Sequence, residues 1–319
     1  MRIAVIIPAF NVAPFLRDAL LSVLDQTHTD WSLTVVDDGS TDTTAAVVAG
    51  FPDERLRLIQ QDNAGVSAAR NRGIRHAARL TPDAFLFLDG DDWLAPDALA
   101  LLADTLDDAP WAVAASGRYA RVATNGTARL SPSPPGGCLL ERLLIRNLFA
   151  NGGHLLIRHE AIEAAGDFRQ DLSYGEDWEY WTRLALLGEF VTVKTHAPVL
   201  FVRERRGSSM LTNATNPAAY RPATDAIHRN PAIAVRLDNS RLAHLRRRAD
   251  AETAWAVGRE LIRHGQQRDG QRWLGRSIRT APSVRRLALI GLSLARFGPF
   301  RPYQTSSSSP LFCRYRECD

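Results

Sequence analysis

Residues 84–93 read Ala-Phe-Leu-Phe-Leu-Asp-Gly-Asp-Asp-Trp, an apolar run followed by three carboxylates around a glycine. A short apolar run that ends in a turn signal is typical of a buried strand in a sheet covered on both faces. Asp89, Asp91 and Asp92 repel one another at close range, which raises their pKa values. A divalent cation removes this repulsion, because Mg²⁺ prefers oxygen ligands and binds one or two carboxylates together with substrate phosphates. The alternative is an acidic turn that only solvates a strand end.

The segments before this stretch alternate between strand and helix patterns. We expect strands at residues 3–7, 31–36, 56–59 and 84–88, with helices beginning near Pro14, after Asp42, near Val66 and at Pro96. This alternation predicts an α/β fold with a Rossmann-like, mostly parallel central sheet. Ligands of such sheets bind outside the carboxyl ends of the strands, and Asn11, Asp37 and Asp38 follow predicted strands there. We therefore predict that the first half of the chain binds a nucleotide.

The later segments are less regular. We expect a strand at 112–118, a loop at 125–137, an amphipathic helix at 139–148, and short strands at 155–157, 191–193 and 199–202. Residues 203–216 are polar, which suits a mobile loop over a site. Beyond residue 223 the sequence is helical and rich in arginine. We therefore predict a catalytic domain at 1–222, a helical basic region at 223–303 and a disordered tail at 304–319.

Charge is unevenly distributed along the 319 residues. The net charge is +4, but residues from 241 onward contain 16 arginines against six acidic residues. An acidic body with a basic C-terminal region predicts a second partner, and an anionic membrane is one candidate. The three cysteines lack zinc-binding spacing, and no stretch is long enough to cross a bilayer. We expect a cytoplasmic protein, with peripheral contact to the inner face of the membrane as an option.

Five motifs together resemble those of the inverting family 2 glycosyltransferases, which have the GT-A, or nucleotide-diphospho-sugar transferase, fold. These motifs lie at residues 5–11, 35–42, 65–73, 87–93 and 175–178, in the order found in that family. The resemblance covers roughly residues 3–206 and leaves the helical region outside it. It implies an enzyme that transfers a sugar from a nucleotide-diphospho-sugar, most commonly a UDP-sugar, to a hydroxyl acceptor.

The resemblance also implies which residues bind the donor. Asp38 would accept a hydrogen bond from the nucleobase imide, and Arg70 would approach the base or the phosphates. Both assignments suit the chemistry of carboxylate and guanidinium groups. The less favoured alternatives are that Asp38 is a turn residue before a helix and that Arg70 is a surface arginine. The other donor-site residues implied are Pro8, Ala9, Phe10, Asn11, Asp37, Asp89 and Gly90. We expect Phe10 to contribute its backbone and to place its ring in the core.

For the metal, the resemblance points to Asp91 as the direct ligand of Mn²⁺ or Mg²⁺, with Asp89 nearer the ribose or a metal-bound water. Asp92 would interact with these two carboxylates without binding the metal itself. The ion would neutralise charge on the departing nucleoside diphosphate. Arg203, Arg205 and Arg206 could close over the phosphates, although a solvated basic loop is an equal alternative.

The resemblance assigns the catalytic base to Asp177, with Glu176 orienting it or binding the acceptor. The dipole of the helix that follows favours the ionised carboxylate. Trp178, Gly153 and His154 are the candidate acceptor contacts. The alternative for Trp178 is a core residue at helical spacing. The alternative for His154 is a structural role, which is the more common one for a lone histidine.

Three other function classes share part of this pattern. A dehydrogenase requires a Gly-x-Gly-x-x-Gly turn after the first strand, and residues 8–14 contain no glycine. A Mg²⁺-dependent phosphatase with an aspartyl nucleophile, or an inactive nucleotide-sugar-binding module, remains an alternative. The resemblance implies a glycan or lipid-linked acceptor in cell-surface polysaccharide or glycolipid synthesis, and no nucleic acid partner.

Overall fold

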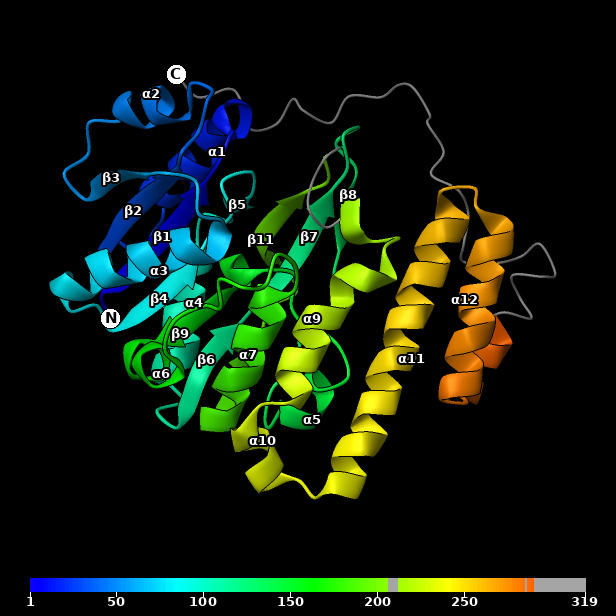
Figure 1. The fold of residues 1–319 in the computed structure, drawn as a ribbon. Helices are drawn as coiled ribbons and strands as arrows, with labels where there is room; N and C mark the ends of the chain where they lie inside the picture. Colours follow the sequence, from blue (N-terminus) through cyan, green and yellow to red (C-terminus); the bar gives the residue numbers. More distant parts are fainter. Residues whose placement is uncertain (206–211, 285, 290–319) are drawn as a thin grey trace. The chain divides into compact units, whose positions relative to one another are not determined.

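The computed structural model describes residues 1–205, 212–284 and 286–289 (Figure 1). These residues form two compact units. The first unit comprises Met1–Leu139 and Leu148–Glu204, and the second comprises Leu140–Asn147 and the described residues from Arg205 onward. The second unit therefore begins earlier than the boundary predicted at residue 222. Arg206 and the predicted tail at 304–319 lie outside the described residues.

The first unit holds eleven strands in the part of the chain that the structure describes. They are β1 (Ile3–Ala9), β2 (Trp31–Asp38), β3 (Leu56–Gln61), β4 (Ala84–Phe87), β5 (Trp93–Leu94), β6 (Ala112–Ser116), β7 (Arg118–Val122), β8 (Ala128–Leu130), β9 (Leu155–Arg158), β10 (Glu189–Thr192) and β11 (Pro198–Arg203). Its helices are α1 (Ala13–Leu24), α2 (Thr44–Ala49), α3 (Val66–Ala77), α4 (Ala98–Asp107), α6 (His159–Ala165) and α7 (Glu176–Leu187), with 3₁₀ turns η1 (Ala78–Leu80) and η2 (Gly152–His154).

Seven strands form the central sheet in the order β10-β6-β9-β4-β1-β2-β3. The strands β4, β1, β2 and β3 are parallel to one another, and β10 is parallel to β6. Only β9 among these seven runs antiparallel to its neighbours β4 and β6. The predicted α/β fold with a mostly parallel sheet is confirmed. A second sheet, in the order β5-β11-β7-β8, lies in the same unit.

Helices cover both faces of the central sheet (Figure 1). Alternate side chains of β1, namely Ile3, Val5 and Ile7, share one hydrophobic core with the apolar faces of α1 and α4. The intervening Ile6 lies under α3, where a Cβ atom on Gly73 would come within 2.5 Å of Ile6 Cγ2. Glycine at this position therefore allows α3 to approach the sheet closely.

Three local expectations were wrong. The predicted strand at 112–118 divides at Gly117, where the chain passes from β6 in the first sheet to β7 in the second. The predicted loop at 125–137 contains β8, and Gly137 forms a bridge with Phe190. The predicted helix at 139–148 shortens to α5 (Leu140–Leu143). All three depend on pairing or packing between distant segments, which local periodicity does not report.

The second unit is helical, as the sequence predicts. Besides α5 it contains α9 (Pro217–His228), α10 (Pro231–Arg236), α11 (Asn239–Arg263) and α12 (Gln267–Thr280). The helices α11 and α12 form a close hairpin, since a Cβ on Gly258 would lie 2.9 Å from the Gly270 carbonyl oxygen. Among the described residues, no helix combines the length and apolar character that a membrane span requires.

Candidate active site

The carboxyl ends of β1, β2 and β4 meet at one edge of the sheet. Ala9 at the end of β1 is in register with Asp37 of β2, and Leu88 just past β4 donates its backbone N–H to the Ile6 carbonyl of β1 at 3.0 Å. Side chains that follow these strands are therefore brought to the same place. The sequence expectation that Asn11, Asp38 and Asp89 share one edge of the sheet agrees with this register.

Asp37 and Asp38 are both buried and hold the loops of this edge. Asp38 accepts hydrogen bonds from Gln61 Nε2 at 2.6 Å and from the backbone N–H groups of Ala64 and Gly65 at 2.9 and 2.8 Å. Asp37 accepts from the Ser40 N–H at 3.0 Å. A carboxylate has about four lone-pair sites. Asp38 therefore retains acceptor capacity for one more donor.

Phe10 and Asn11 follow β1 and differ in role. The Phe10 side chain is 47% exposed, so the expectation that its ring belongs to the core is wrong. The chain turns outward after Ala9, and Asn11 adopts a left-handed φ of 51°. Asn11 Oδ1 accepts from the Thr41 N–H at 2.8 Å, which ties the loop after β1 to the loop after β2. Phe10 follows Ala9, the residue in register with Asp37, and its aromatic ring is exposed.

The loop after β4 is held by two other segments. Asp92 is buried; its Oδ1 accepts from the backbone N–H of Arg203 at 2.9 Å, and its Oδ2 accepts from Asn151 Nδ2 at 2.6 Å. Asp89 Oδ2 accepts from the same Asn151 nitrogen at 3.2 Å. Burial is the main cause that raises the pKa of both carboxyls, and repulsion from Asp91 adds to it. Asn151 begins the segment 151–154, in which the resemblance assigned Gly153 and His154 to the acceptor, and it contacts the carboxylates instead.

Arg70 of α3 connects the loop after β4 to the start of α7. Its Nη2 donates to Asp89 Oδ1 at 3.2 Å and its Nη1 donates to Glu176 Oε1 at 3.0 Å. The Arg70 side chain is only 5% exposed and lies over the ring of Phe168 at 5.3 Å. The next residue, Asn71, fixes Phe168 through both backbone groups, at 2.7 and 2.8 Å. Arg70 is thus a buried bridge between carboxylates rather than a surface arginine.

Glu176 and Asp177 open α7 directly after Gly175, which has a left-handed φ of 77°. Asp177 Oδ1 accepts from the Trp178 N–H at 2.6 Å. Burial and the neighbouring Glu176 carboxylate raise the pKa of Asp177 to about 7, although Arg70 acts in the opposite direction. Burial and the adjacent charge thus outweigh the helix dipole on which the sequence expectation relied, and a pKa of about 7 leaves a large fraction of Asp177 ionised at neutral pH. A carboxyl with a pKa near neutrality suits proton transfer.

The predicted acceptor contacts are buried. His154 is fully buried, its Nδ1 lies 2.7 Å from the Gly117 carbonyl oxygen, and its Nε2 accepts from the Ala150 N–H at 3.1 Å. Burial lowers its pKa to about 4, so it is neutral at pH 7. Both ring nitrogens serve the fold, which corrects the acceptor assignment. Gly153 is likewise buried, and Trp178 is one of the buried residues of α7, with an exposure of 5%.

Arg203 differs from its predicted role. It ends β11, its Nη2 pairs with Asp18 Oδ2 at 2.7 Å, and its Nε donates to the Asp91 carbonyl at 3.0 Å. Its guanidinium also lies over the Trp93 ring at 4.7 Å. These contacts fix Arg203 in the wall of the site, so it is not a free lid residue. Arg205 belongs to the second unit, and Arg206 lies outside the described residues.

The donor atoms after β4 suit a hard divalent cation. Asp91 and Asp89 are the carboxylates of this loop that suit the role. The oxygens of Asp89 and of Asp92 all accept hydrogen bonds from the protein, but the Asp89 side chain is 31% exposed whereas Asp92 is 2% exposed, so Asp89 can still reach a ligand. Among the described residues no group of three or more histidine, cysteine or acidic side chains is arranged to enclose a metal. A site completed by substrate phosphates needs only one or two carboxylates. The residues present therefore fit Mn²⁺ or Mg²⁺ bound together with a diphosphate.

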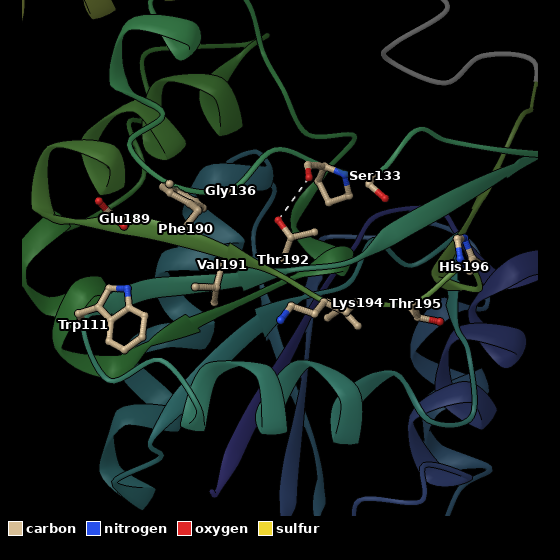
Figure 2. Close-up of a pocket in the computed structure, with 13 residues that line it drawn as sticks. Trp111, Ser133, Gly136, Glu189, Phe190, Val191, Thr192, Lys194, Thr195 and His196 are labelled. Atoms are coloured by element: carbon tan, nitrogen blue, oxygen red, sulfur yellow. Dashed lines mark hydrogen bonds between the residues drawn. The ribbon is translucent and has the colours of Figure 1, made fainter.

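A hollow on the first unit lies elsewhere. A cavity of about 730 Å³ follows the edge strand β10, with Trp111, Thr192, Lys194 and His196 among its lining residues (Figure 2). The strands β6 and β9 separate β10 from β4 in the sheet. The cavity lining contains none of the site residues predicted from the sequence. The strand-end carboxylates, not this hollow, are the candidate active site.

A mostly parallel sheet with carboxylates at its strand ends, and an acidic helix start held to them by a buried arginine, fits the GT-A fold. Residues 4–165 match the family described as Glycosyl transferase family 2. The chain belongs to this family.

Several relatives and solved structures are similar to the chain. It is 39% identical over 103 residues to the glycosyltransferase GlyA of Streptococcus pneumoniae, a match that covers 32% of this chain and 14% of the relative. It is 36% identical over 95 residues to the Escherichia coli UDP-Glc:alpha-D-GlcNAc-diphosphoundecaprenol beta-1,3-glucosyltransferase WfgD, covering 29% of this chain and 36% of the relative. The matches thus span well under half of each relative.

The fold likeness is broader. Staphylococcus aureus TarS 1–349 in complex with UDP-GlcNAc has a TM-score of 0.64 at 19% identity, with 93% of this chain and 88% of that chain covered. The mannosyltransferase PcManGT of Pyrobaculum calidifontis, in complex with GDP-Man and Mn²⁺, has a TM-score of 0.54 at 21% identity, with 94% and 81% covered. At this identity the likeness is one of fold.

Proposed function

We propose that the protein transfers a sugar from a UDP-sugar to a hydroxyl group of a glycan or lipid-linked acceptor, with inversion at the anomeric carbon. The observation that carries this proposal is the Arg70 bridge, because it holds the start of α7 against the strand-end carboxylates. A proton acceptor on α7 and a donor site after β4 are thereby kept in one cluster.

The donor end is formed by the segments after β1, β2 and β4. Asp38 retains acceptor capacity for the imide N–H of a nucleobase, and Phe10, just past β1, offers an exposed ring. Two structures of similar fold hold UDP-GlcNAc and GDP-Man respectively. We propose uridine because UDP-sugars are the most common donors in the family that the sequence motifs resemble.

Asp91 and Asp89 would hold a divalent cation, which supplies Lewis-acid stabilisation of charge on the leaving diphosphate. Asp92 is not proposed as a ligand of the cation. Its two oxygens accept hydrogen bonds from the Asn151 side chain and the Arg203 backbone N–H. Arg70 acts on the same carboxylate as the cation would, because its guanidinium partly offsets the rise in the Asp89 pKa that burial causes.

The chemical step is a single displacement. Asp177 takes the proton of the acceptor hydroxyl as that oxygen forms a bond to the anomeric carbon, and the bond from this carbon to the diphosphate oxygen breaks. The electron pair leaves on the nucleoside diphosphate. A pKa of about 7 places Asp177 close to the value at which general-base catalysis is most effective near neutral pH. Inversion follows because no enzyme-bound sugar intermediate intervenes.

The second unit provides a surface for an anionic membrane. Arg268, Arg272, Arg276 and Arg279 are exposed and recur every three or four residues, so they lie along one face of α12. Two exposed apolar residues, Val284 and Leu287, follow that helix. Each basic residue near an anionic surface contributes about 1 kcal/mol of binding free energy. This surface would bring the enzyme to a lipid-linked acceptor on the cytoplasmic face.

The reaction is tested by release of nucleoside diphosphate from a panel of nucleotide sugars with Mn²⁺, with and without EDTA. We expect release from a UDP-sugar, loss of release in EDTA and its return when Mn²⁺ is restored. Full activity in chelator would refute the metal role. Phosphate release from a phosphomonoester would instead favour the phosphatase, for which the chain's only lysine, Lys194, lies near the distant strand β10.

The base is tested by Asp177→Asn, with Asp171→Asn as the control because Asp171 is exposed in the preceding loop. General-base catalysis contributes about 10²–10⁴-fold, so we expect kcat to fall by that factor while UDP binding is retained. Near-normal turnover of Asp177→Asn would place the base elsewhere, and Glu176→Gln would be the next variant. NMR of the product's anomeric proton reports inversion or retention.

Membrane contact is tested by sedimentation with phosphatidylglycerol vesicles at low and high salt. We expect binding at low salt that weakens when the four α12 arginines are replaced by glutamine. The control replaces Arg72 and Arg79, exposed arginines of the first unit. Absence of binding by the wild-type protein at low salt would end this part of the proposal.

A further inference from the structure

Asn151 makes contacts that no sequence motif predicts. Its side chain is 7% exposed, and its amide nitrogen lies within hydrogen-bond distance of both Asp92 Oδ2, at 2.6 Å, and Asp89 Oδ2, at 3.2 Å. A side-chain amide has two N–H donors, so one amide can serve both carboxylates. Its remaining polar atom, Oδ1, accepts from the Gly153 N–H at 2.9 Å. Every polar atom of this side chain is therefore committed to a partner.

The backbone around Asn151 is fixed as tightly as its side chain. A Cβ atom on Gly152 would lie 2.7 Å from Phe87 Cβ and 2.9 Å from the Phe87 carbonyl oxygen, directly at the end of β4. A Cβ on Gly153 would lie 2.8 Å from Leu200 Cδ1 of β11. On the other side, the Ala150 N–H donates to the buried ring of His154. The turn 150–153 thus has one available position relative to β4.

The two carboxylates that Asn151 joins have different tasks. Both Asp92 oxygens accept hydrogen bonds within the protein, one from the Asn151 side chain and one from the Arg203 backbone N–H. Asp89 shares its oxygens between Asn151 and Arg70 and is 31% exposed, so it can still face a ligand. A neutral donor between two acidic groups satisfies both without adding charge, which an arginine or lysine at this position would not do.

We propose that Asn151 is a positioning residue that fixes the Asp89 and Asp92 carboxylates in the arrangement that binds the nucleotide diphosphate and its divalent cation. This inference rests on the proposed function. It predicts that loss of the Asn151 amide weakens binding of Mn²⁺ and UDP and leaves the base on α7 in place.

The experiment measures the dissociation constants of Mn²⁺ and of UDP with Mn²⁺ by isothermal titration calorimetry. The proteins are the wild type, Asn151→Ala and Asn151→Asp, with Asn125→Ala as the control because Asn125 is exposed in a turn. Residues that orient metal ligands typically change metal affinity by about 10–100-fold when replaced. We expect losses in that range for Asn151→Ala, and no change for Asn125→Ala.

Steady-state kinetics separate positioning from a general folding defect. A positioning role raises the KM for the UDP-sugar, and saturating donor and Mn²⁺ restore most of kcat. A folding defect lowers the active fraction, so kcat falls while KM and the dissociation constants of the folded fraction stay the same. That second pattern, or unchanged Mn²⁺ and UDP affinity in a folded variant, would overturn the inference.

Two further controls keep the result interpretable. Circular dichroism reports whether Asn151→Ala folds; if it does not, Asn151→Asp, which keeps the shape of the side chain, is expected to bind Mn²⁺–UDP more weakly by at least tenfold. The binding measurements do not require transfer to occur. If the wild type binds UDP with Mn²⁺ but transfers no sugar, the proposed function fails while the role of Asn151 is still tested.

Discussion

Replacement of Arg70 tests the cluster as a whole. Arg70→Ala removes the only guanidinium that contacts both Asp89 and Glu176 among the described residues. Breaking a buried ion pair by removing one partner costs about 3–5 kcal/mol of unfolding free energy, because the remaining charge is left unpaired. Here the side chains left behind are 31% and 14% exposed, so water recovers part of that loss. We expect a decrease of about 2–3 kcal/mol for Arg70→Ala.

Arg70→Lys should lose less stability than Arg70→Ala but should not match the wild type. A lysine ammonium is a single point charge and cannot hold two separated carboxylates as a planar fork does. The control is Arg72→Ala, two residues further along α3 and exposed, for which we expect a change within about 0.5 kcal/mol. Urea unfolding followed by circular dichroism and by tryptophan fluorescence measures all three variants.

The same substitution should also change the pH dependence of catalysis. Arg70 lowers the pKa of Asp177, which burial and Glu176 raise to about 7. Without the guanidinium this pKa rises further, and since the base acts only when deprotonated, the acidic limb of the kcat profile should move to higher pH. Unchanged stability together with an unshifted acidic limb would refute the view that Arg70 bridges the two ends of the site.

Two other predictions concern stability. The pKa of Asp177 in the folded protein lies above 3.8, the ordinary value for an aspartate. The folded protein therefore binds more protons than the unfolded chain between about pH 4 and 7. The unfolding free energy of the wild type should therefore fall relative to Asp177→Asn as pH rises through this window, and melting temperatures at pH 4.5 and 8 that keep the same difference would contradict the raised pKa. Gly73→Ala should lose about 1–3 kcal/mol, because the added Cβ would lie 2.5 Å from Ile6 Cγ2. Combining it with Ile6→Ala should recover part of this loss in urea unfolding, and additive losses would argue against the contact.

Local sequence patterns were sufficient to predict the strand–helix alternation of the first 110 residues. They also predicted which edge of the sheet carries the candidate site residues. Both follow from local rules. Apolar runs of four to eight residues form buried strands, and parallel strands bring the residues that follow them to one edge. The positions of Asp38 after β2 and Asp89 after β4 could therefore be predicted without knowledge of any contact.

Other features depended on contacts that no local pattern contains. Strand β9 lies between β4 and β6 and is antiparallel to both, although 38 residues separate it from β6 and 67 residues from β4 in the chain. The outward turn of Phe10 and the full burial of His154 are decided by the space left by neighbouring elements. A residue type alone carries no information about that space.

The active-site network shows the same division. The sequence identified Asp89, Arg70 and Glu176 as separate motif residues, but Arg70 and Glu176 are 106 positions apart and meet only in the folded chain. Asn151, 62 positions from Asp89, carried no motif signal. Folding brings acidic groups together at a cost in desolvation and repulsion, and the tertiary structure decides which donors offset that cost. The sequence thus specified the carboxylates, while the tertiary structure decided which of them hold the fold and which remain available to a ligand.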